Sequence, residues 1–531
     1  MTWRRWVLAA GAAAVVAIVV AAVVVVRGGS APEQPRASGS AIEDPGTVAS
    51  RFLLAFARGD ADAAGALTDA PREASVVLAD VRRGLAPVSV SARLGQVTPG
   101  AARAGAAFQV TWTIGAGQVW SYDNTLDLVS AGGRWVVHWS PAVVHPRLRA
   151  GQLLAVHTRA GRNAVVDRNG RPLLTWQAAG PQVVEPQAAP LLMPALQRAV
   201  SGRSQGGWSV VTTDADGAVQ DTLFGQGDVE VAPLTTTLSL PTQTAAQKAV
   251  DSASSPAMLV AIQPSTGDLL AVAQNAAAGP DPKALNGLYA PGSTFKIATA
   301  AALLESGAAT ADTIADCPAT AQIGQRTIDN DDQFSYPPLP LHSAFAHSCN
   351  TTFAQLASTL PADALADAAG ELGLNADFTI PGITTEAGKV VAADSGAEQV
   401  ESAIGQGTVQ ASPFGLALMA ATVAHGDEVT PRLWQELATE VNTGYRAPGR
   451  AVIAGLRTMM REVVTGGTAT GLRGNGTVYG KTGTAQFGDG SRANGWFAGY
   501  RDDVAFAVLL LGADSSKPAV TVSSAFLSGL G

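Results

Sequence analysis

The chain has 531 residues, 47% of them hydrophobic, which is enough for roughly three or four domains with separate cores. A formal net charge of −8, with no Lys/Arg run longer than a pair, argues against a nucleic-acid-binding surface. Only two cysteines, Cys317 and Cys349, are present; this excludes a disulfide-dense scaffold, and they lack the Cys-x-x-Cys spacing of a zinc site.

One uninterrupted apolar segment stands near the start of the chain. Residues 6–26 are 21 consecutive apolar residues, which as a helix span ~30 Å at ~1.5 Å per residue. This length predicts a transmembrane anchor, because the apolar part of a cleaved secretory signal is only about 7 to 15 residues long. Two arginines before the segment against one after it slightly favour a cytoplasmic tail of residues 1–5. Residues 27–43, rich in Gly, Ser, Ala and Pro, are predicted to be a flexible linker.

Residues 44–146 are predicted to form a domain with helices first and strands after them. Apolar residues recur at helical spacing around Phe52, and they alternate with other residues around Val110 and on both sides of a Gly132-Gly133 turn. This order of helices and a curved antiparallel sheet resembles the NTF2-like fold. Such a cone could hold a ligand, but we expect a structural use as a pedestal.

A second non-catalytic region is predicted over residues 147–237. Asn169-Gly170 between apolar stretches predicts a hairpin turn, and packing explains these residues without any chemistry. Residues 238–531 then form the last domain. A hairpin is expected at its start, with strands over residues 258–263 and 268–273.

A candidate nucleophile follows this hairpin. The Pro291-Gly292 turn leads into Ser293 and an apolar run, which predicts a loop entering a buried helix. Lys296 stands three residues later, nearly one turn, so its amine and the Ser293 hydroxyl share a face. A desolvated lysine can lose its proton near neutral pH and activate a serine, which arginine cannot do. Ser-x-x-Lys also occurs by chance, and alone it decides nothing.

Two later stretches give the Ser-x-x-Lys spacing its meaning. Ser348-Cys349-Asn350 and Lys481-Thr482-Gly483-Thr484 follow it in that order. The triplet Ser-x-x-Lys, Ser-x-Asn, Lys-Thr-Gly resembles the penicillin-binding proteins and serine β-lactamases. Three further stretches support a transpeptidase of this group: residues 264–268, residues 405–407 followed by Pro413, and residues 496–499.

The region before the catalytic domain adds to this resemblance. Six residues are similar to a signature of monofunctional (class B) penicillin-binding proteins: Arg162, Val165, Asp167, Arg168, Asn169 and Gly170. Asn163 replaces the usual glycine of that signature. With the NTF2-like pattern, the chain resembles a class B penicillin-binding protein of the methicillin-resistance type.

The resemblance implies an α+β transpeptidase domain, an antiparallel sheet with a helical subdomain, on the NTF2-like and pedestal domains. Five residues are expected to act in catalysis: Ser293 as nucleophile, Lys296 as general base, Ser348 as proton shuttle, Asn350 as the amide that holds Lys296, and Lys481 as a charge for the substrate carboxylate. Three more are expected to bind substrate: Thr482, Gly483 and Thr484. The backbone N–H groups of Ser293 and Thr484 resemble the family's oxyanion hole.

The expected reaction is cross-linking of peptidoglycan. Ser293 would attack the D-alanyl-D-alanine bond of a stem peptide, and an amine of a neighbouring peptide would accept the acyl group. β-Lactams are expected as covalent inhibitors, and other cell-wall synthesis proteins are candidate partners; nucleic acid, metal and cofactor are not expected. Because this peptide lies outside the cytoplasmic membrane, we expect a single-pass membrane protein with an extracytoplasmic catalytic domain.

Several alternatives stay open. A membrane-anchored β-lactamase or D,D-carboxypeptidase would share the motifs, and Glu371 with Asn375 matches the Glu-x-x-x-Asn pattern that class A β-lactamases use, although it lies closer to Ser348 than in those enzymes. A non-catalytic cell-wall scaffold is the third hypothesis. The two cysteines either form a disulfide or are separate buried thiols. The role in elongation or division, the acceptor amine, the susceptibility to β-lactams and the oligomeric state are not determined by the sequence.

Overall fold

The computed structural model describes residues 43–115, 118–158, 163–177, 180–185, 189–200, 208–225, 232–488 and 490–531. The described residues form two compact units. The first is made of residues 43–146 without 80–89 and 112–120, and the second of those two segments and the described residues from 147 to 531. The predicted anchor, residues 6–26, lies outside the described residues. Within the described ranges, no helix combines the length and apolar character needed to cross a membrane.

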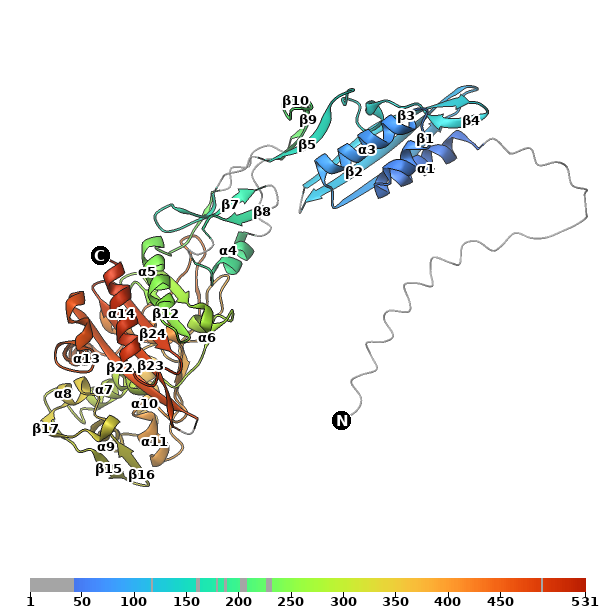
Figure 1. The fold of residues 1–531 in the computed structure, drawn as a ribbon. Coiled ribbons are helices and arrows are strands. Elements are labelled where there is room, and N and C mark those ends of the chain that lie inside the picture. The colour runs from blue at the N-terminus through green and yellow to red at the C-terminus, as the bar shows by residue number, and fades with distance from the viewer. Residues whose placement is uncertain are drawn as a thin grey trace, which may run out of the picture. The chain divides into compact units, whose positions relative to one another are not determined.

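The first elements follow the predicted order of helices and then strands (Figure 1). They are α1 (Pro45–Arg58), α2 (Ala61–Gly65), α3 (Pro71–Leu85), β1 (Ser89–Thr98), β2 (Arg103–Gly115), β3 (Gln118–Ala131) and β4 (Arg134–Val137), with sheet order β1-β2-β3-β4. Helix α1 begins where the Asp44 carboxylate accepts from Gly46 N and Thr47 N, and it ends at Gly59 in the left-handed conformation. Gly132 and Gly133 both have positive φ and form the predicted β3–β4 turn.

The next region consists of two small sheets and one helix. Its elements are β5 (Leu153–Thr158), β6 (Asn163–Val166), β7 (Pro172–Gln177), β8 (Gly180–Val183), α4 (Met193–Val200), β9 (Trp208–Thr213), β10 (Val219–Gly225) and β11 (Leu234–Thr235), in sheet orders β10-β9-β5 and β11-β6-β7-β8. The Asn169-Gly170 turn joins β6 to β7, with Gly170 at φ 80° as a hairpin requires.

The signature residues of this region connect it to the catalytic domain. The Asp167 carboxylate is fully buried and accepts from Asn169 N, Arg171 N and Leu240 N, the last at the start of α5. The Arg168 guanidinium lies 3.3 Å from the buried Asp268 carboxylate. These contacts are structural, as predicted for packing; Arg162 lies outside the described residues.

A five-stranded antiparallel sheet forms the centre of the catalytic domain, in the order β13-β12-β24-β23-β22. Its strands are β12 (Ala257–Ile262), β13 (Leu269–Gln274), β22 (Val478–Phe487), β23 (Arg492–Arg501) and β24 (Val504–Leu510). The predicted first hairpin is β12–β13. Every residue of these two strands is buried because helices cover both faces of the sheet. The covering helices are α5 (Leu240–Asp251), α12 (Pro413–His425) and α14 (Lys517–Gly529).

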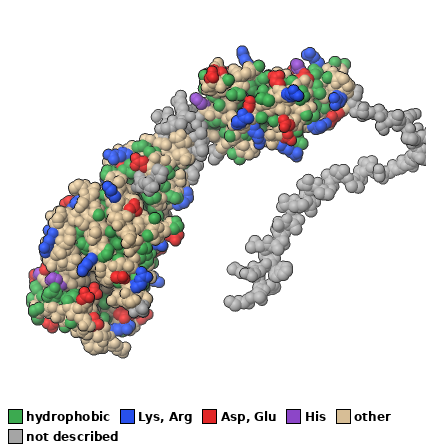
Figure 2. Space-filling view, in the orientation of Figure 1, with side chains coloured by type: hydrophobic (Ala, Val, Ile, Leu, Met, Phe, Trp, Pro, Cys, Tyr) green, Lys and Arg blue, Asp and Glu red, His purple; other side chains and the backbone are tan. Residues whose placement is uncertain are grey.

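The remaining elements form the helical subdomain and its ribbons. The helices are α6 (Lys283–Asn286), α7 (Lys296–Glu305), α8 (Leu341–Ala346), α9 (Asn350–Ala357), α10 (Ala364–Glu371), α11 (Gly396–Ser402) and α13 (Arg450–Thr465). The ribbons are β14 (Ile314–Cys317) with β17 (Tyr336–Pro340), β15 (Thr320–Ile323) with β16 (Arg326–Asp329), β18 (Asp377–Thr379) with β21 (Glu440–Thr443), and β19 (Gly388–Lys389) with β20 (Gln410–Ala411). On the visible face of this domain, basic side chains lie among acidic ones (Figure 2).

Candidate active site

Ser293 lies in a single 3₁₀ turn, Gly292–Phe295, that runs directly into α7. The turn packs against the backbone of β22, since a Cβ at Gly292 would lie 2.5 Å from the Thr484 carbonyl oxygen. A Cβ at Gly483 would lie 2.7 Å from the Pro291 carbonyl oxygen in the same way. Glycine at these two positions therefore allows the close approach of the first and third motifs.

Lys296 is fully buried, and its amine touches three of the predicted residues. Nζ lies 3.0 Å from Ser293 Oγ, 2.6 Å from Asn350 Oδ1 and 2.8 Å from the Ser348 carbonyl oxygen. Burial, and the nearby charge of Lys481, hold the pKa of Lys296 well below its ordinary value. A neutral amine has two N–H donors and one lone pair. In the neutral form, donation to the Asn350 and Ser348 carbonyl oxygens would leave the lone pair for the Ser293 hydroxyl.

Ser348 stands between the two lysines. It has a positive φ of 64°, an unusual backbone conformation for serine. Ser348 Oγ is 2.8 Å from Lys481 Nζ and 3.3 Å from Lys296 Nζ. Lys481 is fully buried, and its burial lowers the pKa to about 7. One hydroxyl therefore connects the two amines, as a proton shuttle requires.

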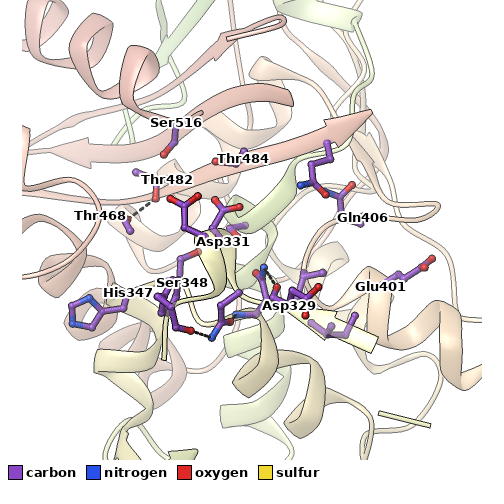
Figure 3. A pocket seen from close by; sticks show the side chains of 18 of the residues that line it. Asp329, Asp331, His347, Ser348, Glu401, Gln406, Thr468, Thr482, Thr484 and Ser516 are labelled. Atoms are coloured by element: carbon purple, nitrogen blue, oxygen red, sulfur yellow. Dashed lines mark hydrogen bonds between the residues drawn. The ribbon is translucent and has the colours of Figure 1, made fainter. Parts of the chain in front are cut away.

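A cavity of about 600 Å³ opens in front of these groups (Figure 3). Ser293, Ser348 and Asn350 line it together with Thr482 and Thr484 of β22, whereas the lysines lie behind them. The predicted position of Lys481 on an edge strand is confirmed, since β22 ends the sheet order. An edge strand leaves backbone groups for an extended peptide.

One wall of this cavity is acidic and was not predicted from the sequence. Asp329, Asp331, Asp332 and Glu401 line it, and Figure 3 shows Asp329 across the cavity from Thr482 and Thr484. Burial lowers the pKa values of Lys296 and Lys481, and the negative charge of Asp331 acts in the opposite direction and raises both. No motif marks these carboxyl groups. The Gly-Gln-Gly stretch is the sequence signal for another part of the site. Gly405 O accepts from Gly292 N at 2.9 Å, next to Ser293.

The two cysteines are joined in a disulfide, with their Cα atoms 6.0 Å apart. Cys317 ends β14, and Cys349 precedes α9, so the bond fixes the turn that carries Ser348 and Asn350. Both residues are buried. The disulfide alternative is thus the one the structure contains.

The sequence profile described as penicillin binding protein transpeptidase domain matches residues 257–527, about half of the chain. The chain belongs to this transpeptidase family. A second profile, described as NTF2-like N-terminal transpeptidase domain, matches residues 44–152. Both predicted family assignments are confirmed.

Two curated relatives of this transpeptidase family are named peptidoglycan D,D-transpeptidase PbpA. That of Mycobacterium tuberculosis (strain H37Rv) is 28% identical over 311 residues, 50% of this chain and 60% of the relative. That of Mycolicibacterium smegmatis is 29% identical over 301 residues, 48% of this chain and 61% of the relative. The chain therefore spans about 60% of the length of the curated relatives it matches.

Solved penicillin-binding proteins share the fold. The ceftriaxone acyl-enzyme complex of penicillin-binding protein A from M. tuberculosis matches with a TM-score of 0.58 at 23% identity, covering 70% of this chain and 98% of that one. PBP2 of Pseudomonas aeruginosa in complex with WCK 5153 matches with a TM-score of 0.56 at 22% identity, covering 70% of this chain and 96% of that one.

Glu371 and Asn375 have structural contacts away from the cavity. Among the described residues that line the cavity, neither is present. Asn375 Nδ2 donates to Val390 O, and its Oδ1 accepts from Val390 N, which fixes the end of α10. Glu371 faces Glu305 of α7, and burial together with this carboxylate raises the pKa of Glu371 to about 7.

Replacing Glu371 by Gln should stabilise the protein above neutral pH. Glu371 ionises near pH 4.5 when unfolded and near 7 when folded, so the folded state binds more protons between these values and stability falls as pH rises through them. We expect a gain on the order of 1 kcal/mol at pH 8 and almost none at pH 4, because solvent screens this partly exposed pair. Thermal unfolding at both pH values measures it. Glu440→Gln, an exposed carboxyl on β21, is the control, and an equal gain from it would contradict the assignment.

Proposed function

We propose that the protein is a peptidoglycan D,D-transpeptidase that cross-links stem peptides through an acyl-enzyme on Ser293 and is acylated by penicillin. The observation that carries this proposal is the buried Lys296 amine, whose Nζ lies 3.0 Å from Ser293 Oγ, 2.8 Å from the Ser348 carbonyl oxygen and 2.6 Å from Asn350 Oδ1. The name of the PbpA relatives supports the same reaction.

In the acylation half-reaction, Lys296 takes the Ser293 proton while Oγ bonds to the carbonyl carbon of the penultimate D-alanine. The C–N bond then breaks, and Ser348 passes a proton between the lysines and the nitrogen of the leaving D-alanine. The backbone N–H groups of Ser293 and Thr484 are proposed to stabilise the oxyanion, where one donor is typically worth about 10²–10³ in rate.

In the second half-reaction, an amine of another stem peptide attacks the ester carbonyl. The C–O bond to Ser293 breaks, the amine loses a proton, and Oγ regains one through Lys296. Thr482 and Thr484 line the cavity where the terminal carboxylate of the donor would bind. Lys481 lies behind them, in contact with Ser348, and its positive charge would attract this carboxylate. Gly483 keeps the strand close to the nucleophile.

The proposed organisation of the chain has six parts. Residues 1–5 form a cytoplasmic tail, 6–26 a membrane anchor and 27–43 a linker; residues 44–146 are the NTF2-like domain, 147–237 the pedestal and 238–531 the transpeptidase domain. The uninterrupted apolar run supports the anchor. The catalytic domain would then face the cell wall, where it would meet its stem-peptide substrates. Other cell-wall synthesis proteins would be its partners there.

The proposal predicts a long-lived penicillin adduct. Deacylation needs a positioned water and a free base, and the one glutamate with a β-lactamase-like spacing, Glu371, does not line the cavity. The purified protein is acylated with penicillin, free drug is removed, and the adduct mass is followed. We expect the adduct to persist over many minutes. Turnover of many penicillin molecules per minute would assign a β-lactamase instead, and no adduct at all would favour the scaffold.

A further inference from the structure

A buried asparagine outside the three motifs connects the segments around the second motif. Asn330 lies between β16 and the 3₁₀ turn Asp331–Gln333, and its exposed fraction is 2%. Nδ2 donates to the Pro318 carbonyl oxygen at 2.9 Å and to the Phe334 carbonyl oxygen at 3.0 Å. A buried amide with these partners holds two backbone segments at a fixed separation, since an unpaired buried donor is costly.

The other end of the same amide caps helix α9. Asn330 Oδ1 accepts from Asn350 N at 2.7 Å and from Thr351 N at 3.2 Å, the first N–H groups of the helix. The N-cap residue itself, Cys349, provides no capping hydrogen bond, and its sulfur is in the disulfide. A helix start normally receives this bond from a local Ser, Thr, Asn or Asp. Here a residue 20 positions earlier supplies it.

The neighbouring backbone orients the Asn350 side chain. Asn350 Nδ2 donates to the Asp329 carbonyl oxygen at 2.9 Å, which leaves Oδ1 directed at Lys296 Nζ, 2.6 Å away. Residues 329 and 330 therefore fix both the backbone and the amide orientation of Asn350. The next residue, Asp331, brings a carboxylate whose charge acts on Lys296.

We propose that Asn330 is a positioning residue for acylation: by capping α9 it holds Asn350 against Lys296, and so directs the lysine lone pair at Ser293. This inference rests on the proposed acylation at Ser293. Without the cap, the start of α9 moves, Asn350 no longer holds the amine, and water reaches Lys296. Both the geometry and the low pKa of the base are then lost.

The test compares Asn330→Leu and Asn330→Ala, neither of which has a capping oxygen, with matched changes at Asn275. Asn275 has an exposed fraction of 6%, its Nδ2 donates to Ser255 O at 2.8 Å, and its Oδ1 accepts from Ala257 N at 3.0 Å, but it does not line the cavity. The full-length protein is acylated with labelled penicillin across a pH series, and thermal unfolding is measured in parallel. We expect comparable losses of thermal stability at both sites. Only the Asn330 variants should acylate about 10 to 100 times more slowly, with the pH midpoint shifted upward.

Equal acylation rates and pH midpoints in the Asn330 and Asn275 variants would overturn the inference and leave Asn330 a structural residue. The chain has only six lysines, so ¹³Cε-lysine NMR can follow Lys296 directly, with Lys296→Arg giving the assignment. A parent protein that the labelled penicillin does not acylate would refute the proposed function. The NMR midpoint still decides the inference in that case, because an unchanged Lys296 midpoint in Asn330→Leu refutes it and an upward shift supports it.

Discussion

Ser293→Ala is expected to abolish covalent labelling by penicillin, with the acylation rate falling by at least about 10⁴-fold. In the proposed reaction Ser293 Oγ opens the strained lactam, and alanine offers no atom that can form the ester. The variant should remain folded, because Ser293 is partly exposed at the cavity surface and the glycines beside it make the close contacts. Gel fluorescence with a labelled penicillin, and the intact mass, measure the loss.

Ser306→Ala is the matched control for this experiment. Ser306 ends the same helix, α7, and its Oγ donates to the Ala302 carbonyl oxygen at 2.8 Å. It should label at the parent rate. Labelling of Ser293→Ala at a rate near that of the parent would show that another residue is the nucleophile.

Lys296→Arg should acylate about 10³-fold more slowly, although it keeps a positive charge. A guanidinium cannot accept a proton in this pH range, so Ser293 would have no base. In the parent, burial lowers the pKa of Lys296, and in the proposed reaction the neutral amine is the active form. The acylation rate of the parent should therefore fall as pH is lowered through the Lys296 pKa. Stopped-flow or quenched acylation across pH measures both effects.

Two controls separate chemistry from folding for this substitution. Lys283→Arg changes a half-buried lysine whose Nζ donates to the Ala278 carbonyl oxygen, and it should acylate as the parent does. Lys296→Met removes charge and base together, and thermal unfolding reports whether each variant folds. If folded Lys296→Arg keeps a tenth of the parent rate, Lys296 is an electrostatic residue and a different base is required.

Local sequence was sufficient for much of the fold because the signals are local. Asp44 and Gly59 bound the first helix through bonds to nearby backbone groups, and Gly132-Gly133 supplies the positive φ that its turn requires. The three motifs were equally readable, since each is a short run of reactive residue types with fixed spacing. The predicted residues around Ser293 and Lys296 are indeed brought together.

The sequence by itself determined which groups could react and which family the chain resembles. It could not determine the cysteine pairing, because 32 residues of separation fix no distance, and the fold brings the two Cα atoms to 6.0 Å. No motif marks Asn330 or Asp331, because each acts on a residue distant in the chain: Asn330 accepts from Asn350 N, and the charge of Asp331 acts on Lys296. Only tertiary packing buries Lys296 and so lowers its pKa, because desolvation depends on every segment around the amine and not on its sequence neighbours.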